Sequence, residues 1–144
     1  ATKPLLWGVL DLHYIRNAGS AFGFLSGSDS PFRIPFFVGV SFLAIGIILS
    51  LFHKMEDSEV VIPVALSLVL GGAVGNLVDR VLYGWVLDFI HVWVRVGERT
   101  WSWPDFNVAD SAISVGAVLL SARFLWRSRE AIRAGVSAAP APSP

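Results

Sequence analysis

Three long apolar stretches dominate the hydrophobic pattern of the chain. Residues 34–52 and 60–77 contain no charged side chain, and residues 109–125 contain only Asp110 near one end and Arg123 near the other. An α-helix rises about 1.5 Å per residue, so the first stretch alone would span about 28 Å, which is enough to cross the apolar core of a bilayer. The pattern therefore predicts three membrane-spanning helices.

The segments between these stretches follow a different pattern. Residues 10–14 alternate between apolar and polar side chains, which is the period of a β-strand with one buried face. Residues 86–96 are rich in β-branched and aromatic side chains and are expected to form a second short strand. We therefore expect a mainly α fold, an integral membrane helical bundle with a small β element.

The composition agrees with a membrane protein and narrows the possible chemistry. Hydrophobic residues make up 54% of the 144 residues and charged residues 15%, whereas soluble domains usually carry about 25% charged residues. The net charge of zero gives no support for nucleic acid binding. The chain has no cysteine, and its histidines, His13, His53 and His91, form no HExxH motif, so neither a metal site nor a cofactor is expected.

Residues 1–133 are expected to form a single membrane-embedded domain. Residues 134–144 are rich in Ala, Pro and Ser and are expected to form a disordered tail. Arginines gather just after the third apolar stretch, which predicts a cytoplasmic C-terminus. Alternation across the membrane then places residues 1–33 and 78–108, with the β element, on the extracytoplasmic side. We interpret the tryptophans of the second segment as an interfacial belt rather than a substrate-stacking surface.

Two aspartates, Asp88 and Asp110, lie where apolar stretches meet polar segments. Ionisable groups at membrane depth are costly, so they indicate function. Two carboxylates brought together can share one proton and supply an acid and a base at the same pH, as an aspartyl protease requires. One alternative is a transporter or proton-relay subunit, and another is a membrane scaffold without catalytic activity. A relay would place acidic residues near the middle of the membrane helices, whereas these two lie near the ends. Asn107 or Asp110 could also be an ordinary helix N-cap.

Other polar residues have both a structural and a functional interpretation. Asn76 could join two helices or line a polar site, and Arg80 could be a cation reaching the membrane interface or part of the same site. Residues 16–23 could form a plain turn, or the Asn17 side chain and backbone amides such as that of Gly19 could bind an extended peptide. Gly71 and Gly75 form a small-xxx-small face that would let another helix approach.

Four blocks of sequence, in order along the chain, resemble the bacterial signal peptidase II family, the lipoprotein signal peptidases. The resemblance covers the chain from about residue 10 to residue 125. The blocks are residues 16–22 (RNAGSAF), 71–80 (GGAVGNLVDR), 86–89 (VLDF) and 106–111 (FNVADS).

The resemblance implies an aspartyl endopeptidase of the inner membrane. Such an enzyme removes the signal peptide from diacylglyceryl-modified prolipoproteins just before the lipidated cysteine. Asp88 and Asp110 match the family's catalytic pair. The polar residues that line its site and bind substrate match Asn17, Asn76, Arg80 and Asn107, with Gly19 in the same block as Asn17. The family needs no metal or cofactor and is the target of globomycin, a cyclic peptide that occupies the substrate groove.

The resemblance also implies four membrane helices, of which three are evident in this sequence. Residues 1–3 (ATK) resemble the end of the family's first-helix motif, D-x-x-[TS]-K, and the preceding apolar run is absent. We therefore expect that the first helix and part of a loop are missing through truncation; a natural three-helix variant is the less favoured alternative. One chain carries both aspartates, so a monomer is expected. Residues 85–105 are expected to cover the groove.

Overall fold

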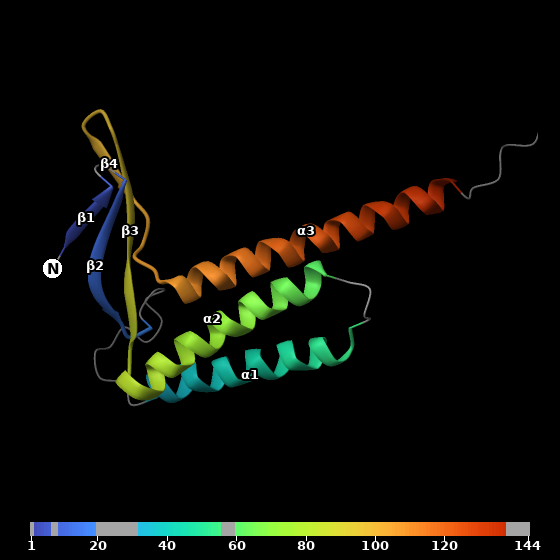
Figure 1. The fold of residues 1–144 in the computed structure, drawn as a ribbon, viewed down its shortest axis with the longest axis horizontal. Coiled ribbons are helices and arrows are strands. Elements are labelled where there is room, and N and C mark those ends of the chain that lie inside the picture. The colour runs from blue at the N-terminus through green and yellow to red at the C-terminus, as the bar shows by residue number, and fades with distance from the viewer. Residues whose placement is uncertain (1, 7–8, 20–31, 56–59, 138–144) are drawn as a thin grey trace, which may run out of the picture.

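A helical bundle carries a four-stranded sheet at one end (Figure 1). The computed structural model describes residues 2–6, 9–19, 32–55 and 60–137. The sheet stands across the end of the bundle where α2 ends and α3 begins (Figure 1). In chain order the elements are β1 Lys3–Leu6, β2 Leu10–Asn17, α1 Arg33–His53, α2 Val61–Tyr83, β3 Val86–Val96, β4 Arg99–Ser102 and α3 Val108–Ser137.

Each predicted apolar stretch forms a helix. Within the described residues, α1, α2 and most of α3 are long and apolar enough to cross a membrane. Pro35 and Pro63 lie in the first turns of α1 and α2, where the missing N–H costs no hydrogen bond. The helix α2 continues past its predicted end at residue 77, so that Arg80 is helical, and ends at Gly84 in the left-handed conformation (φ 77°). Large apolar side chains on all three helices are exposed, as expected for surfaces that face lipid.

The helix α3 extends further than the sequence pattern indicated. It continues through Ser137, so the expectation of disorder from residue 134 is wrong for residues 134–137. Small and apolar residues continue there, and the first proline of the tail is only at position 140, so nothing in the sequence stops the helix earlier. Residues 138–144 lie outside the described residues.

Close packing of α2 on α3 depends on two glycines. A Cβ added to Gly72 would meet the Ala109 carbonyl oxygen and Ile113, and one added to Gly116 would meet the Ala65 carbonyl oxygen. The predicted small-xxx-small face is wrong for Gly71, where a Cβ would meet nothing within 4 Å, but Gly75 does face α3, since a Cβ there would lie 3.5 Å from the Ala109 Cβ. The closest approach of the two helices is at Gly72, where the absence of a side chain lets the backbones come together.

The sheet is antiparallel in the order β1-β2-β3-β4. Strands β2 and β3 coincide with the two predicted strands. Strands β1 and β4 were not predicted, because strands of four residues are too short to show a periodicity. Lys3, which matches the last residue of the family's first-helix motif, pairs with Leu12 in the sheet.

Candidate active site

The two aspartates come from different elements that meet at the junction of bundle and sheet. Asp88 is the third residue of β3, five residues after the end of α2, and Ile15 of β2 is its partner in the register. Asp110 lies in the first turn of α3. Asp88 is 3% exposed, so its carboxylate depends on protein groups rather than water for hydrogen bonds.

Two amide side chains supply the hydrogen bonds of Asp88. Asn17 Nδ2 donates to Asp88 Oδ2 at 2.8 Å, and Asn107 Nδ2 donates to Oδ1 at 3.0 Å. Burial raises the pKa of Asp88 above its usual range, and the nearby charge of Asp110 acts in the same direction. The two amide hydrogen bonds favour the ionised form and oppose this shift. The carboxyl group is therefore held in place while its proton affinity is raised.

Asp110 and Asn107 cap the start of α3 reciprocally. The Asp110 backbone N–H donates to Asn107 Oδ1 at 2.9 Å, and the Asn107 backbone N–H donates to Asp110 Oδ2 at 3.2 Å. This is the arrangement of a capping box, in which each residue satisfies a backbone donor of the other. The N-cap prediction is thus confirmed for Asn107, and Asp110, the third residue of the helix, completes the capping box.

Asn107 also joins the two carboxylates. Its Nδ2 atom donates to Asp88 and, at 3.2 Å, to Asn76 Oδ1, while Asn76 Nδ2 donates to Asp110 Oδ1 at 2.8 Å. Asn76 and Asn107 are 8% and 5% exposed. Within the described part of the chain, no buried side-chain polar atom lacks a hydrogen-bond partner. We call Asn17, Asn76, Asp88, Asn107 and Asp110 the amide network.

Gly19 supports this network in a different way from the one predicted. Its backbone N–H donates to Asn17 Oδ1 at 2.8 Å, so this amide is not free to bind a peptide. The bond leaves the Asn17 Nδ2 atom to donate to Asp88. Gly19 has φ 93°, and a Cβ there would collide with the ring of Phe37. The position therefore requires glycine.

Arg80 lies one helical turn after Asn76. Its guanidinium donates to the Asn76 backbone oxygen at 3.0 Å and lies 5.2 Å from the centre of the Phe37 ring. Both aspartates of the amide network and Asp79 contribute favourable charge interactions with this guanidinium. Arg80 thus places a positive charge beside the carboxylates, as the sequence indicated. Its partners in the structure are a carbonyl and an aromatic face.

A cavity of about 500 Å³ opens beside the amide network. Asn76 and Asn107 line it together with Trp85 and Phe89, which belong to the segment expected to cover a groove. Trp85 also meets the Tyr14 ring edge-on, with ring centres 6.2 Å apart, and lies under the Arg16 guanidinium at 5.0 Å. Trp101 and Trp103 are mostly exposed, as an interfacial belt would require. Trp85 therefore has a different environment from these two.

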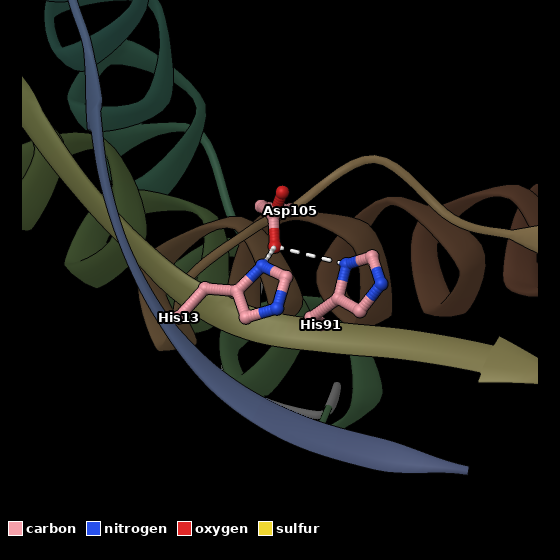
Figure 2. A group of neighbouring side chains, drawn as sticks. All are labelled: His13, His91 and Asp105. Carbon is pink, nitrogen blue, oxygen red and sulfur yellow. Dashed lines mark hydrogen bonds and ion pairs between the residues drawn. The ribbon is translucent and has the colours of Figure 1, made fainter. Parts of the chain in front are cut away.

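A second polar cluster was missed by the sequence analysis. His13 of β2 and His91 of β3 both direct Nδ1 toward Asp105 Oδ1, at 2.8 and 3.0 Å (Figure 2). The two imidazole rings stack with their centres 4.1 Å apart. The HExxH motif detects only two histidines that lie one turn apart on a helix. These residues come together through strand pairing, which local spacing cannot show. We call them the histidine cluster.

The amide network joins two carboxylates through amide hydrogen bonds. The charge of Asp110 acts with burial to raise the pKa of Asp88. One could then accept a proton from water while the other donates one to a carbonyl oxygen.

Known proteins match this chain over most of its length. A family model described as signal peptidase (SPase) II matches residues 1–126. The lipoprotein signal peptidase of Geobacter sulfurreducens is 44% identical over 126 residues, which cover 88% of this chain and 75% of that protein. The lipoprotein signal peptidase of Geobacter metallireducens is 47% identical over 118 residues, which cover 82% of this chain and 69% of that protein.

Two solved structures have a similar fold. The first, described as a bacterial membrane enzyme, superimposes with a TM-score of 0.74 at 30% identity and covers 89% of this chain and 73% of its own. The second carries the same description, with a TM-score of 0.73 at 31% identity, and covers 87% of this chain and 75% of its own.

Proposed function

This chain belongs to the signal peptidase II family, and we propose that it is an aspartyl endopeptidase that removes the signal peptide from diacylglyceryl-modified prolipoproteins. Cleavage falls just before the lipidated cysteine. The observation that carries the proposal is the position of Asn107, whose side chain and backbone donate to Asp88 and Asp110 respectively. Asn107 thereby holds in place two carboxylates that come from separate elements, β3 and α3.

The two aspartates divide the work of hydrolysis. The ionised carboxylate removes a proton from water, and the protonated one donates to the carbonyl oxygen of the scissile bond. Burial raises the pKa of Asp88, which favours placing the shared proton there. Asp110 lies in the first turn of α3, where the helix dipole attracts negative charge. The shared proton is a property of the pair rather than of one residue.

The surrounding residues bind and orient the substrate. The cavity bordered by Asn76 and Asn107 is large enough for several residues of an extended peptide. The amide groups hold the carboxylates and offer further hydrogen-bond capacity to a peptide backbone. Trp85 and Phe89 form an apolar wall on the same cavity. Arg80 adds positive charge that stabilises the anionic state of the pair.

The membrane supplies the remaining specificity. The exposed apolar faces of the three helices contact lipid, and an apolar signal peptide lying in the bilayer reaches the site laterally. The arginines after the third apolar stretch favour a cytoplasmic C-terminus and an active site at the extracytoplasmic face of the bacterial inner membrane. A monomer suffices, and cyclic peptides of the globomycin type would compete for the same cavity.

The test is a cleavage assay with purified full-length protein in detergent or lipid. The substrates are a diacylglyceryl-modified prolipoprotein and its unlipidated precursor. The enzymes are the parent, Asp88→Asn, Asp110→Asn and Asp11→Asn, which makes the same change in the sheet, outside the amide network and its cavity. We expect the parent and Asp11→Asn to cut only the lipidated precursor and the other two to be inactive. Near-parental activity in Asp88→Asn or Asp110→Asn would overturn the mechanism, and equal cutting of the unlipidated precursor would overturn the substrate.

A further inference from the structure

The histidine cluster gathers metal-ligand atoms from three separate segments. His13 lies on β2, His91 on β3, and Asp105 on the connection from β4 to α3. Each offers one nitrogen or oxygen atom, and these atoms all lie within 4.8 Å of one another. Two imidazoles and a carboxylate form a common ligand set for zinc, and the chain offers no thiolate that would favour a softer metal.

The ligand atoms already converge. Both Nδ1 atoms face the same oxygen of Asp105, which lies at the Nδ1 edge of the stacked rings (Figure 2). Zinc bonds of about 2.0–2.2 Å in tetrahedral geometry place ligand atoms about 3.3 Å apart. The two nitrogen–oxygen distances, 2.8 and 3.0 Å, therefore need to lengthen by only a few tenths of an ångström. The imidazoles must tilt toward a common point between them.

Access and charge favour a cation at this position. The three side chains are 18–22% exposed, so water can enter as a fourth ligand and the rings have room to tilt. Asp11 lies opposite His91 in the register of β2 and β3, and its Oδ2 atom accepts the indole N–H of Trp93 at 2.7 Å. A second carboxylate is thus fixed beside the cluster and adds negative potential.

We propose that His13, His91 and Asp105 form a binding site for one Zn²⁺ ion, with water as the fourth ligand. The ion cross-links β2, β3 and the segment that leads into α3. The next residue, Phe106, exchanges backbone hydrogen bonds with Ile90 at 2.8 and 3.1 Å, and Asn107 follows it. The ion would therefore stiffen the strands and the turn that hold the amide network, without contacting the reacting atoms.

A purely hydrogen-bonded cluster is the competing interpretation. In it, both imidazoles donate Nδ1–H to Asp105 and no ion is involved. The two interpretations differ in whether the protein binds zinc with a defined stoichiometry, so the ion itself must be measured.

The experiment uses full-length protein in detergent, freed of any polyhistidine tag and treated with a chelator. Zn²⁺ is titrated against a competing chromophoric chelator, and thermal unfolding is followed with and without Zn²⁺. We expect one ion per chain and a rise in Tm with added Zn²⁺, because the ion binds the folded state. His13→Asn and His91→Asn should each lose stoichiometric binding. Asp105→Asn should weaken it about tenfold or more.

His53→Asn is the matched control, because it removes the remaining histidine, which lies exposed at the end of α1. It should bind Zn²⁺ as the parent does. The proposal is overturned if the parent binds no Zn²⁺, or if the double variant His13→Asn/His91→Asn binds it equally well. Should that variant fold poorly, Co²⁺ in the parent decides: intense tetrahedral absorption bands support the site, and the weak spectrum of hydrated Co²⁺ overturns it.

Discussion

The amide network and the histidine cluster use the same short segment of chain and surround their carboxylates with different groups. Asp105 meets two imidazoles, whereas Asp110, five positions later, meets the side-chain amide of Asn76 and a backbone amide. Amides donate hydrogen bonds but neither gain nor lose a proton near neutral pH. Imidazoles are bases and metal ligands.

This difference explains how one segment can supply two kinds of chemistry. Around Asp88 and Asp110 the only groups hydrogen-bonded to the carboxylates within the described structure are amides, so a proton in this network stays with the carboxylates. Around Asp105 the imidazoles offer nitrogen lone pairs, and the carboxylate becomes one ligand among several. The neighbours contributed by α2, β2 and β3 decide which chemistry each aspartate has.

The largest effect should come from making the same substitution in both places. Asp88→Asn and Asp110→Asn should each lower the cleavage rate about 10³-fold or more, because an amide can neither share a proton nor activate water. Asp105→Asn should keep activity within about tenfold, since it lies outside the reacting pair. Steady-state cleavage of a lipidated precursor measures all three. An equally large loss in Asp105→Asn would mean that the two clusters act as one.

Removing the bridge between the carboxylates should have the next largest effect. Asn107→Ala leaves Asp88 Oδ1 and the Asp110 backbone N–H without their partner. We expect a loss of about 10- to 100-fold in kcat and of about 1–3 kcal/mol in the free energy of unfolding. Zinc binding at the histidine cluster should persist. Ser111→Ala, which removes only a hydrogen bond to the Asn107 carbonyl, is the control and should change kcat little.

A smaller effect should follow from disturbing the helix contact beneath the amide network. Gly72→Ala places a methyl group against the Ala109 carbonyl oxygen, next to Asp110, and should cost about 1–3 kcal/mol of stability. Gly71→Ala meets open space and should be close to neutral. Thermal unfolding in detergent compares the two. Equal stabilities would show that α2 and α3 separate easily at this point.

The smallest effect should be the pH dependence that Asp88 contributes to stability. Burial raises its pKa in the folded state, so folding favours the protonated form. The stabilisation is fully present below the ordinary pKa of an aspartate and is lost as the pH rises through the raised value. Asn cannot titrate, so the stability of the parent relative to Asp88→Asn should fall as the pH rises across this window. Unfolding series at several pH values test the direction, and a rise would contradict it.

Local sequence signals predicted the elements that carry the amide network. The alternation of apolar and polar residues predicted β2, and the β-branched and aromatic content predicted β3. The uncharged apolar stretches predicted the helices. These local patterns are sufficient because one environment dominates each element. The strands have one face buried in the sheet, and the helices face lipid. The position of Asp88 and Asp110 at the ends of apolar stretches then indicated a polar junction, and the family resemblance named the pair.

The histidine cluster could not be predicted because it depends on register. His13 and His91 are brought together by the pairing of β2 with β3, whose register shifts between Leu12 and Ile15. A one-residue slip would turn either imidazole to the opposite face of the sheet. The double role of Asn107 was equally hidden, because a cap residue and a bridging residue look alike in sequence.

The reciprocal cap at Asn107 and Asp110 ties the start of a helix to the position of a carboxylate in the amide network. The hydrogen bonds that nucleate the first turn of α3 are the same ones that orient the Asp110 carboxylate. A chain in which α3 has begun at Val108 already has this acid in place, and one in which the turn has frayed has lost both. The start of α3 and the position of the Asp110 carboxylate are therefore gained or lost together.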